Sequence, residues 1–143
     1  MGRKILVTGG AGMVGSTLVK SLITDSDDKI LIADNLWRGR KEYLFKNGEP
    51  VIDFDDQFFE VDLRELSACK KVVEGVDEVY HLADIVAGIN YVFANQSSLF
   101  HDNLLINSNI MKASAEAGVE KFLYVGTACS YPQSLQFGVD APP

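Results

Sequence analysis

The 143-residue sequence has few cysteines and no long apolar run. Its two cysteines, Cys69 and Cys129, are too few for a disulfide framework and lack metal-ligand spacing. No apolar run approaches the roughly 20 residues that cross a bilayer, and the first residues do not read as a signal peptide. We therefore expect a cytoplasmic protein with no bound metal and no membrane contact.

Positive charge is scarce as well. The sequence contains 13 Lys and Arg residues and 20 Asp and Glu residues, which gives a formal net charge of −7. Nucleic acids and anionic membranes attract basic surfaces, so we expect no nucleic-acid partner. The content of hydrophobic residues, 47%, and of charged residues, 23%, is typical of a globular domain.

Strand and helix patterns alternate along the chain. Short apolar runs predict five strands, at residues 4–9, 29–34, 57–62, 77–83 and 121–126. Helical spacing predicts helices at 13–23, 66–74 and 97–117, and a short helix at 40–46 followed by a loop. This alternation indicates an α/β fold with a doubly wound parallel sheet (Rossmann), strand order 3-2-1-4-5-6 and a ligand site beyond the carboxyl ends of the strands.

The segment "TGGAGMVG" links the first strand to the first helix and spaces Gly9, Gly12 and Gly15 three residues apart. Such glycines permit a tight turn, close approach of a phosphate and close packing of helix on strand. The helix N-terminus attracts a pyrophosphate. A structural turn is the alternative. A phosphate-loop nucleotidase is disfavoured, because Ser16 stands where that motif needs lysine.

Asp34 ends the second strand, 19 residues after Gly15. A carboxylate there can accept both hydroxyls of an adenosine ribose and repels a 2′-phosphate, which favours NAD over NADP. Arg38 and Arg40 weaken this preference, since a guanidinium can bind a phosphate. Both arginines can equally belong to a solvated loop.

Several segments resemble the extended short-chain dehydrogenase/reductases, the family of NAD-dependent nucleotide-sugar epimerases and dehydratases. They are "TGGAGMVG", "DNLWRGR", "VDL" and "HLAD". Within the family, the run "GVEKFLYVGTACSYP" resembles the GDP-mannose 3,5-epimerases and GDP-fucose synthases. The resemblance covers essentially the whole chain but only about the first half of a typical member.

This resemblance implies an NAD site. The pyrophosphate would contact Gly9, Gly12, Met13, Val14 and Gly15, and the adenosine ribose would contact Asp34 and Asn35. Arg38 and Gly39 would lie close to a phosphate, and Asp62 and Leu63 would contact the adenine. The nicotinamide side would be lined by Leu82, Ala83 and Asp84. Asp84 stands where the family usually has alanine. Asn103 matches the motif asparagine of the long helix, and a buried helix–helix hydrogen bond is the alternative for it.

The resemblance also implies two catalytic residues, Thr127 as the active-site Ser/Thr and Cys129 as an acid/base cysteine. Alternation along an extended chain places both on one side with Tyr131. Cys129 can instead be a small buried hydrophobe. Among the remaining candidates, we expect Cys69 in the core, His81 as a buried packing residue, and His101 on the surface.

The Tyr-x-x-x-Lys base of the family is absent, because none of the five tyrosines has lysine four residues later. We therefore expect residues 1–143 to be an incomplete dinucleotide-binding domain without turnover of its own. The last strands and the C-terminal substrate domain would be missing. The full enzyme would act on a nucleotide sugar, most simply a GDP-sugar, by transient oxidation.

Other functions stay open from the sequence. They are a non-catalytic dinucleotide-binding regulator, an oxidoreductase of the UDP-glucose 4-epimerase type, and a structural or interaction module. We also expect self-association or a homodimer, because the last strand and the long helix would expose apolar surface. The alternative is that the tail at residues 132–143 folds back over the edge of the sheet.

Overall fold

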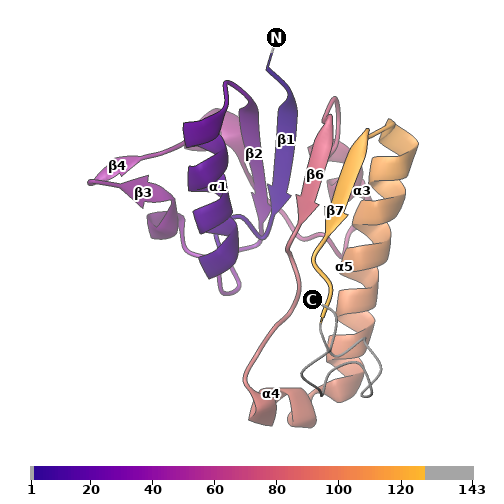
Figure 1. Cartoon of the computed structure of the whole chain (residues 1–143). Coiled ribbons are helices and arrows are strands. Elements are labelled where there is room, and N and C mark those ends of the chain that lie inside the picture. The colour runs from indigo at the N-terminus through magenta and orange to yellow at the C-terminus, as the bar shows by residue number, and fades with distance from the viewer. Residues whose placement is uncertain (1, 128–143) are drawn as a thin grey trace, which may run out of the picture.

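The computed structural model describes residues 2–127, and its core is a parallel sheet of five strands (Figure 1). The strand order is β5-β2-β1-β6-β7, which confirms the predicted doubly wound order for the first five strands. The strands are β1 (Lys4–Thr8), β2 (Lys29–Asp34), β5 (Phe58–Glu60), β6 (Glu78–His81) and β7 (Lys121–Tyr124).

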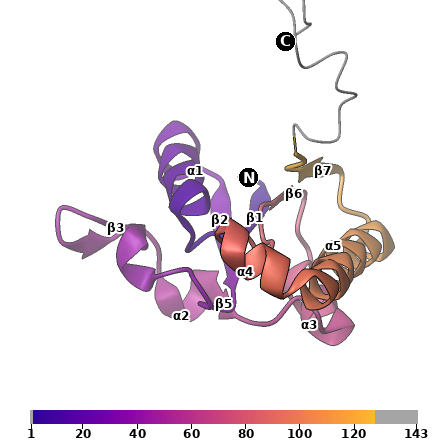
Figure 2. The same ribbon diagram turned by 90° about the horizontal axis from the view of Figure 1, so that it is seen from below.

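Helices cover both faces of this sheet, as Figure 2 shows from the carboxyl ends of the strands. Side chains alternate between the faces: Ile5 and Val7 pack with α1, whereas Leu6 packs with α3 and α5. Central strands buried on both faces read as continuous apolar runs, which explains the pattern in the sequence. The three helices are α1 (Met13–Asp25), α3 (Leu66–Val72) and α5 (Gln96–Ala117).

The edge strand β7 is the least covered part of the sheet in the described residues. It pairs only with β6, and its Phe122 packs against the core beneath α5. Leu123 and Tyr124 are 40% and 51% exposed. The apolar surface expected at this edge is therefore present.

The prediction was wrong for residues 45–56, where we expected the end of a short helix and a loop, and for Gln57, which was expected in the third strand but ends the helix α2. The structure has the 3₁₀-helix η1, a two-stranded hairpin and a one-turn helix. Asn47 and Gly48 both adopt positive φ, which makes the tight turn of the hairpin. These elements are η1 (Lys41–Leu44), β3 (Phe45–Lys46), β4 (Glu49–Pro50) and α2 (Phe54–Gln57).

Helix α4 (Ile89–Ala94) was not predicted. Its six residues, Ile-Asn-Tyr-Val-Phe-Ala, are mostly apolar although none is buried, and an apolar run this short does not distinguish a helix from a strand by its periodicity. It follows the loop after β6 and precedes α5 beyond the carboxyl ends of the strands (Figure 1). In residues 2–127, no helix combines the length and hydropathy that crossing a membrane requires.

Candidate functional site

A cavity of about 310 Å³ lies beyond the carboxyl ends of β1, β2, β5 and β6. This is where ligands bind in doubly wound sheets. Most of its wall comes from the end of β2 and from the loops that follow these strands: Gly9, Gly12, Ala33, Asp34, Asn35, Trp37, Arg38, Gly39, Val61, Asp62, Leu63, Arg64, Leu82, Ala83, Asp84 and Ile85. Tyr91 of α4 and Ser98, Leu99, Asp102 and Ile106 of α5 complete it.

The glycine loop is built by close backbone contacts. Gly9 has φ +68° and donates its N–H to the carbonyl of Ala33 at 2.8 Å. A Cβ on Gly15 would lie 2.2 Å from the Gly9 carbonyl oxygen, so only glycine fits there. A Cβ on Gly12 would meet only that oxygen, at 3.1 Å. Gly9 and Gly15 therefore hold the turn, and Gly12 leaves room at the cavity.

Helix α1 begins at this loop. Its N-cap, Gly12, supplies no side-chain cap, and the first turn leaves backbone N–H groups for a ligand. Met13 and Val14 are 80% and 63% exposed, and neither lines the cavity. These two residues can therefore offer a pyrophosphate their backbone rather than their side chains.

Asp34 has a structural task in addition to its predicted one. Its carboxylate accepts hydrogen bonds from the N–H of Ala11 at 3.0 Å and of Leu36 at 2.8 Å. A Cβ on Gly39 would lie 2.7 Å from the same carboxylate. Asp34 thus holds the glycine loop and the loop after β2 together. A carboxylate has about four lone-pair sites, so it can still accept from a ligand.

Trp37 and Arg38 reach across the cavity from the loop after β2. The Arg38 Nη1 donates to the carbonyl of Val86 at 2.8 Å, and the Trp37 ring lies 6.1 Å from that of Tyr91. Arg40 does not line the cavity. Within residues 2–127, Arg38 pairs with no carboxylate, which leaves its charge for an anionic ligand.

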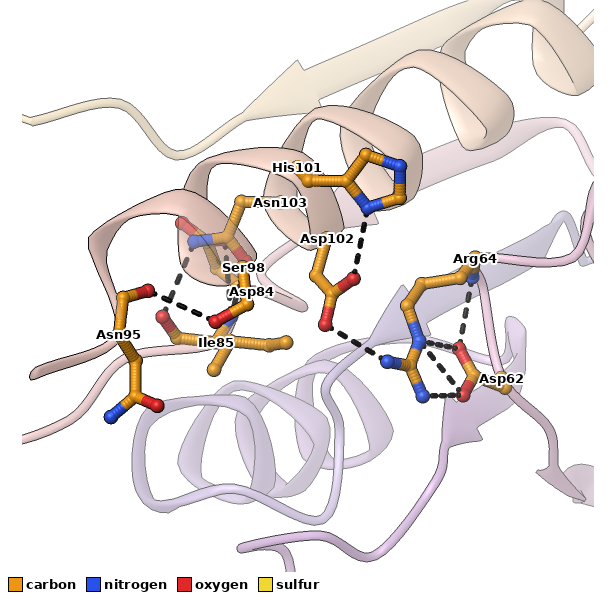
Figure 3. Close-up of polar contacts among 9 residues, drawn as sticks. All are labelled: Asp62, Arg64, Asp84, Ile85, Asn95, Ser98, His101, Asp102 and Asn103. Carbon is orange, nitrogen blue, oxygen red and sulfur yellow. Dashed lines mark hydrogen bonds and ion pairs between the residues drawn. The ribbon is translucent and has the colours of Figure 1, made fainter. Parts of the chain in front are cut away.

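Asp62, Arg64 and Asp102 form a charged network on the opposite wall (Figure 3). The Arg64 Nη2 lies 2.6 Å from Asp62 Oδ2, and its Nη1 lies 2.9 Å from Asp102 Oδ2. The hydrogen bond from the Arg64 side chain lowers the pKa of Asp62. Arg64 is therefore already occupied by two carboxylates. The sequence pattern did not reveal Arg64 or Asp102 as site residues.

Asn103 clamps the loop after β6 (Figure 3). Its Oδ1 accepts from the N–H of Ile85 at 2.8 Å, and its Nδ2 donates to the Ile85 carbonyl at 3.2 Å. The alternative of a helix–helix hydrogen bond is wrong, because the partner is this loop. Asp84 lies beside it, and desolvation raises the pKa of its carboxyl group.

A second cavity of about 640 Å³ adjoins the first, and Asp84, Ile85 and Leu99 line both. Asn103 and Thr127 line the second cavity only. Thr127 therefore lies on the same cavity as Asp84 and Ile85 of the loop after β6. Cys129 and Tyr131 lie outside the described residues.

The remaining candidates are structural. His81 is buried and hydrogen-bonded on both ring nitrogens, as expected of a packing histidine. Cys69 is buried in the core, and burial raises the pKa of its thiol to about 11. The side chain of His101 is 69% exposed. Over residues 2–127, no three His, Cys, Asp or Glu side chains gather as metal ligands would.

The strand order, the glycine loop at the amino end of α1 and the cavity across the strand ends together define a Rossmann-type α/β domain. The chain belongs to the NAD dependent epimerase/dehydratase family, whose model matches residues 5–142.

Known relatives extend beyond this chain. GDP-mannose 3,5-epimerase of Arabidopsis thaliana is 32% identical over 133 residues, which are 93% of this chain and 33% of that protein. The structure of Thermus thermophilus UDP-glucose 4-epimerase in complex with NAD matches with 30% identity and a TM-score of 0.69. The matched region covers 87% of this chain and 37% of the chain of the UDP-glucose 4-epimerase.

A third relative is the UDP-N-acetylglucosamine 4-epimerase of Methanobrevibacter ruminantium, solved with UDP-N-acetylmuramic acid. It is 25% identical with a TM-score of 0.78, over 97% of this chain and 43% of that one. The chain thus spans about a third of the length of the curated relative, and well under half of either solved structure.

Proposed function

We propose that residues 1–143 bind NAD and form the cofactor-binding part of a nucleotide-sugar epimerase or dehydratase. The proposal is carried by one observation: the glycine loop and Asp34 line the same cavity at the carboxyl ends of the strands. The similarity to a UDP-glucose 4-epimerase in complex with NAD supports the same ligand.

The order of the strand ends around the cavity supports one arrangement of a bound dinucleotide. The loop of Gly9 and Gly12 would take the pyrophosphate, and Asp34 with Asn35 the adenosine ribose. Asp62 and Leu63 would then lie beside the base. Arg38 and Gly39 would approach a phosphate. On the other side, Leu82, Ala83 and Asp84 would line the nicotinamide, with Asn103 holding their loop through Ile85.

The charges of the cavity favour NAD over NADP. Asp34 is buried at the expected position of the ribose, where a 2′-phosphate would meet its negative charge. Arg64 cannot readily compensate, because Asp62 and Asp102 already pair with it. Arg38 lacks such a carboxylate partner in the described part of the chain, but one guanidinium also suits the pyrophosphate of NAD.

For the whole protein we propose a GDP-sugar substrate, supported by the similarity to GDP-mannose 3,5-epimerase. NAD would supply a hydride acceptor and return the hydride. Thr127 would bind a sugar hydroxyl or carbonyl, and Cys129 would move a proton. The similarity to a UDP-glucose 4-epimerase keeps a UDP-sugar as the second candidate. Without a Tyr-x-x-x-Lys base, this chain alone should not turn over.

Titration calorimetry of the chain with NAD and with NADP tests the proposal. We expect NAD to bind with Kd in the micromolar to millimolar range and NADP to bind more weakly. Asp34→Ala should reduce the difference between the two cofactors. Tighter binding of NADP by the unmodified chain would contradict the role of Asp34, and no binding of either would contradict the proposed function. Assays with GDP- and UDP-sugars should show no turnover.

A further inference from the structure

Asp84 places a carboxylate at the junction of the two cavities. It lines both the 310 Å³ cavity of the proposed cofactor and the 640 Å³ cavity that Thr127 also lines. The carboxylate stands where the family usually has alanine, whose methyl group carries no charge and accepts no hydrogen bond. The proposed fit of NAD therefore does not by itself account for this charge.

The carboxylate of Asp84 keeps acceptor capacity for a ligand. Its Oδ1 accepts from the N–H of Ile85 at 3.1 Å (Figure 3). Within residues 2–127, no Lys, Arg or His side chain pairs with it, whereas Arg64 pairs with both carboxylates on the other wall of the cavity. Desolvation that no cation offsets raises the pKa of Asp84. Asp84 is thus an uncompensated negative charge on the cavity wall.

The backbone on both sides of Asp84 is held in place. A Cβ on Gly9 would lie 3.0 Å from the Cα of Ala83, so the loop after β6 lies directly against the glycine loop. On the other side, Asn103 makes two hydrogen bonds to the backbone of Ile85. With the pyrophosphate at the glycine loop, the nicotinamide half of the dinucleotide would lie beside this fixed carboxylate.

The two redox forms of the cofactor differ in charge in this half. The nicotinamide ring carries one positive charge in NAD and none in NADH, whereas the pyrophosphate and the adenosine are the same in both. A carboxylate beside the ring attracts the charged form and gains nothing of the kind from the neutral one. The comparison of NAD with NADH therefore isolates the effect of this one charge.

We propose that Asp84 makes the cofactor site bind NAD more tightly than NADH. This inference rests on the proposed NAD binding, with the nicotinamide at the loop after β6. A site that prefers the oxidised form lowers the reduction potential of the bound couple, which makes the bound NADH a better hydride donor. Transient oxidation of a sugar requires that the hydride be returned, so this preference serves the proposed reaction.

Calorimetry with NAD and with NADH at pH 8, where the carboxyl group of Asp84 is ionised, tests the inference. The measured quantity is the Kd for NADH divided by the Kd for NAD. Asp84→Asn removes the charge but keeps an oxygen that can accept from the Ile85 N–H. It should lower the ratio about threefold, because water screens a charge at this exposed residue. Asp84→Ala should lower the ratio as much, and it is the second variant should Asp84→Asn not fold.

Glu74→Gln is the matched control, since it removes the same charge from an exposed position that lines neither cavity. It should leave the ratio unchanged, and thermal unfolding shows whether each variant keeps the fold. An unchanged ratio in the Asp84 variants, or an equal change of affinity for NAD and NADH, would overturn the inference and leave NAD binding intact. Binding of neither dinucleotide by the unmodified chain would overturn the proposed function itself, and the inference with it.

Discussion

The Thr8 hydroxyl lies 2.7 Å from Nδ1 of His81, and so links the carboxyl ends of the adjacent strands β1 and β6. The Thr8 oxygen also accepts from the N–H groups of Leu82 and Ala83, both at 3.2 Å. Its single proton is therefore donated to Nδ1. The opposite ring nitrogen, Nε2, then carries the hydrogen and donates it to Asn107 Oδ1 at 2.8 Å. The contacts select one neutral tautomer of His81.

This arrangement makes stability depend on pH. Burial lowers the pKa of His81 below its usual value near 6.5. Below about pH 6.5 the unfolded chain binds a proton that the folded chain does not, so the free energy of unfolding should fall with decreasing pH until the folded pKa is reached. The slope for one group is at most about 1.4 kcal/mol per pH unit.

Urea unfolding between pH 5 and pH 8 measures this slope. His81→Gln should remove most of it, whereas His101→Gln, at an exposed position, should preserve it. An unchanged slope in His81→Gln would assign the pH dependence to other groups.

Substitutions at two glycines of the loop should have different effects, one on the stability of the fold and the other on ligand binding. Gly15→Ala places a Cβ 2.2 Å from a backbone oxygen and should destabilise the fold by about 1–3 kcal/mol. Gly12→Ala meets only one atom, at 3.1 Å, and should keep the fold while weakening NAD binding. Thermal unfolding and calorimetry measure the two effects. Similar unfolding temperatures for the two variants would contradict this division.

The clamp of Asn103 on Ile85 should stabilise the loop after β6. Asn103→Ala removes two hydrogen bonds to the Ile85 backbone and should cost about 1–3 kcal/mol. Amide exchange at Ile85 should accelerate correspondingly. Asn90→Ala, on the exposed α4, is the control and should change neither quantity. Unaltered exchange at Ile85 in Asn103→Ala would show that other contacts hold the loop.

Self-association is expected from the apolar face of α5. Phe100, Leu104 and Met111 lie on one side of this helix, at spacings of four and seven residues, and are 73%, 55% and 51% exposed. Sedimentation at several concentrations should show oligomers that Leu104→Glu weakens. Thr17→Glu adds the same charge on the exposed face of α1 and should not weaken them. A strictly monomeric unmodified chain would contradict the expectation.

The sequence by itself was sufficient for the strands and for the glycine loop with Asp34. These features are local, because a buried strand, a glycine turn and an amphipathic helix each leave a pattern within about 20 residues. The strand order then followed from the general rules for connecting alternating strands and helices. The apolar stripe of α5 was recognised for the same reason, and Leu99, Ile106 and Ile110 are buried as that stripe requires.

Only the tertiary structure decided which side chains meet across the strand ends. Arg64 and Asp102 are 38 residues apart, and Thr8 and His81 are 73 residues apart. Their contacts depend on how strands and helices pack in space, which the periodicity of one segment does not encode. The same holds for Asn103, whose polar place on an apolar stripe was visible in the sequence but whose partner, the Ile85 backbone, was set by the path of the loop after β6.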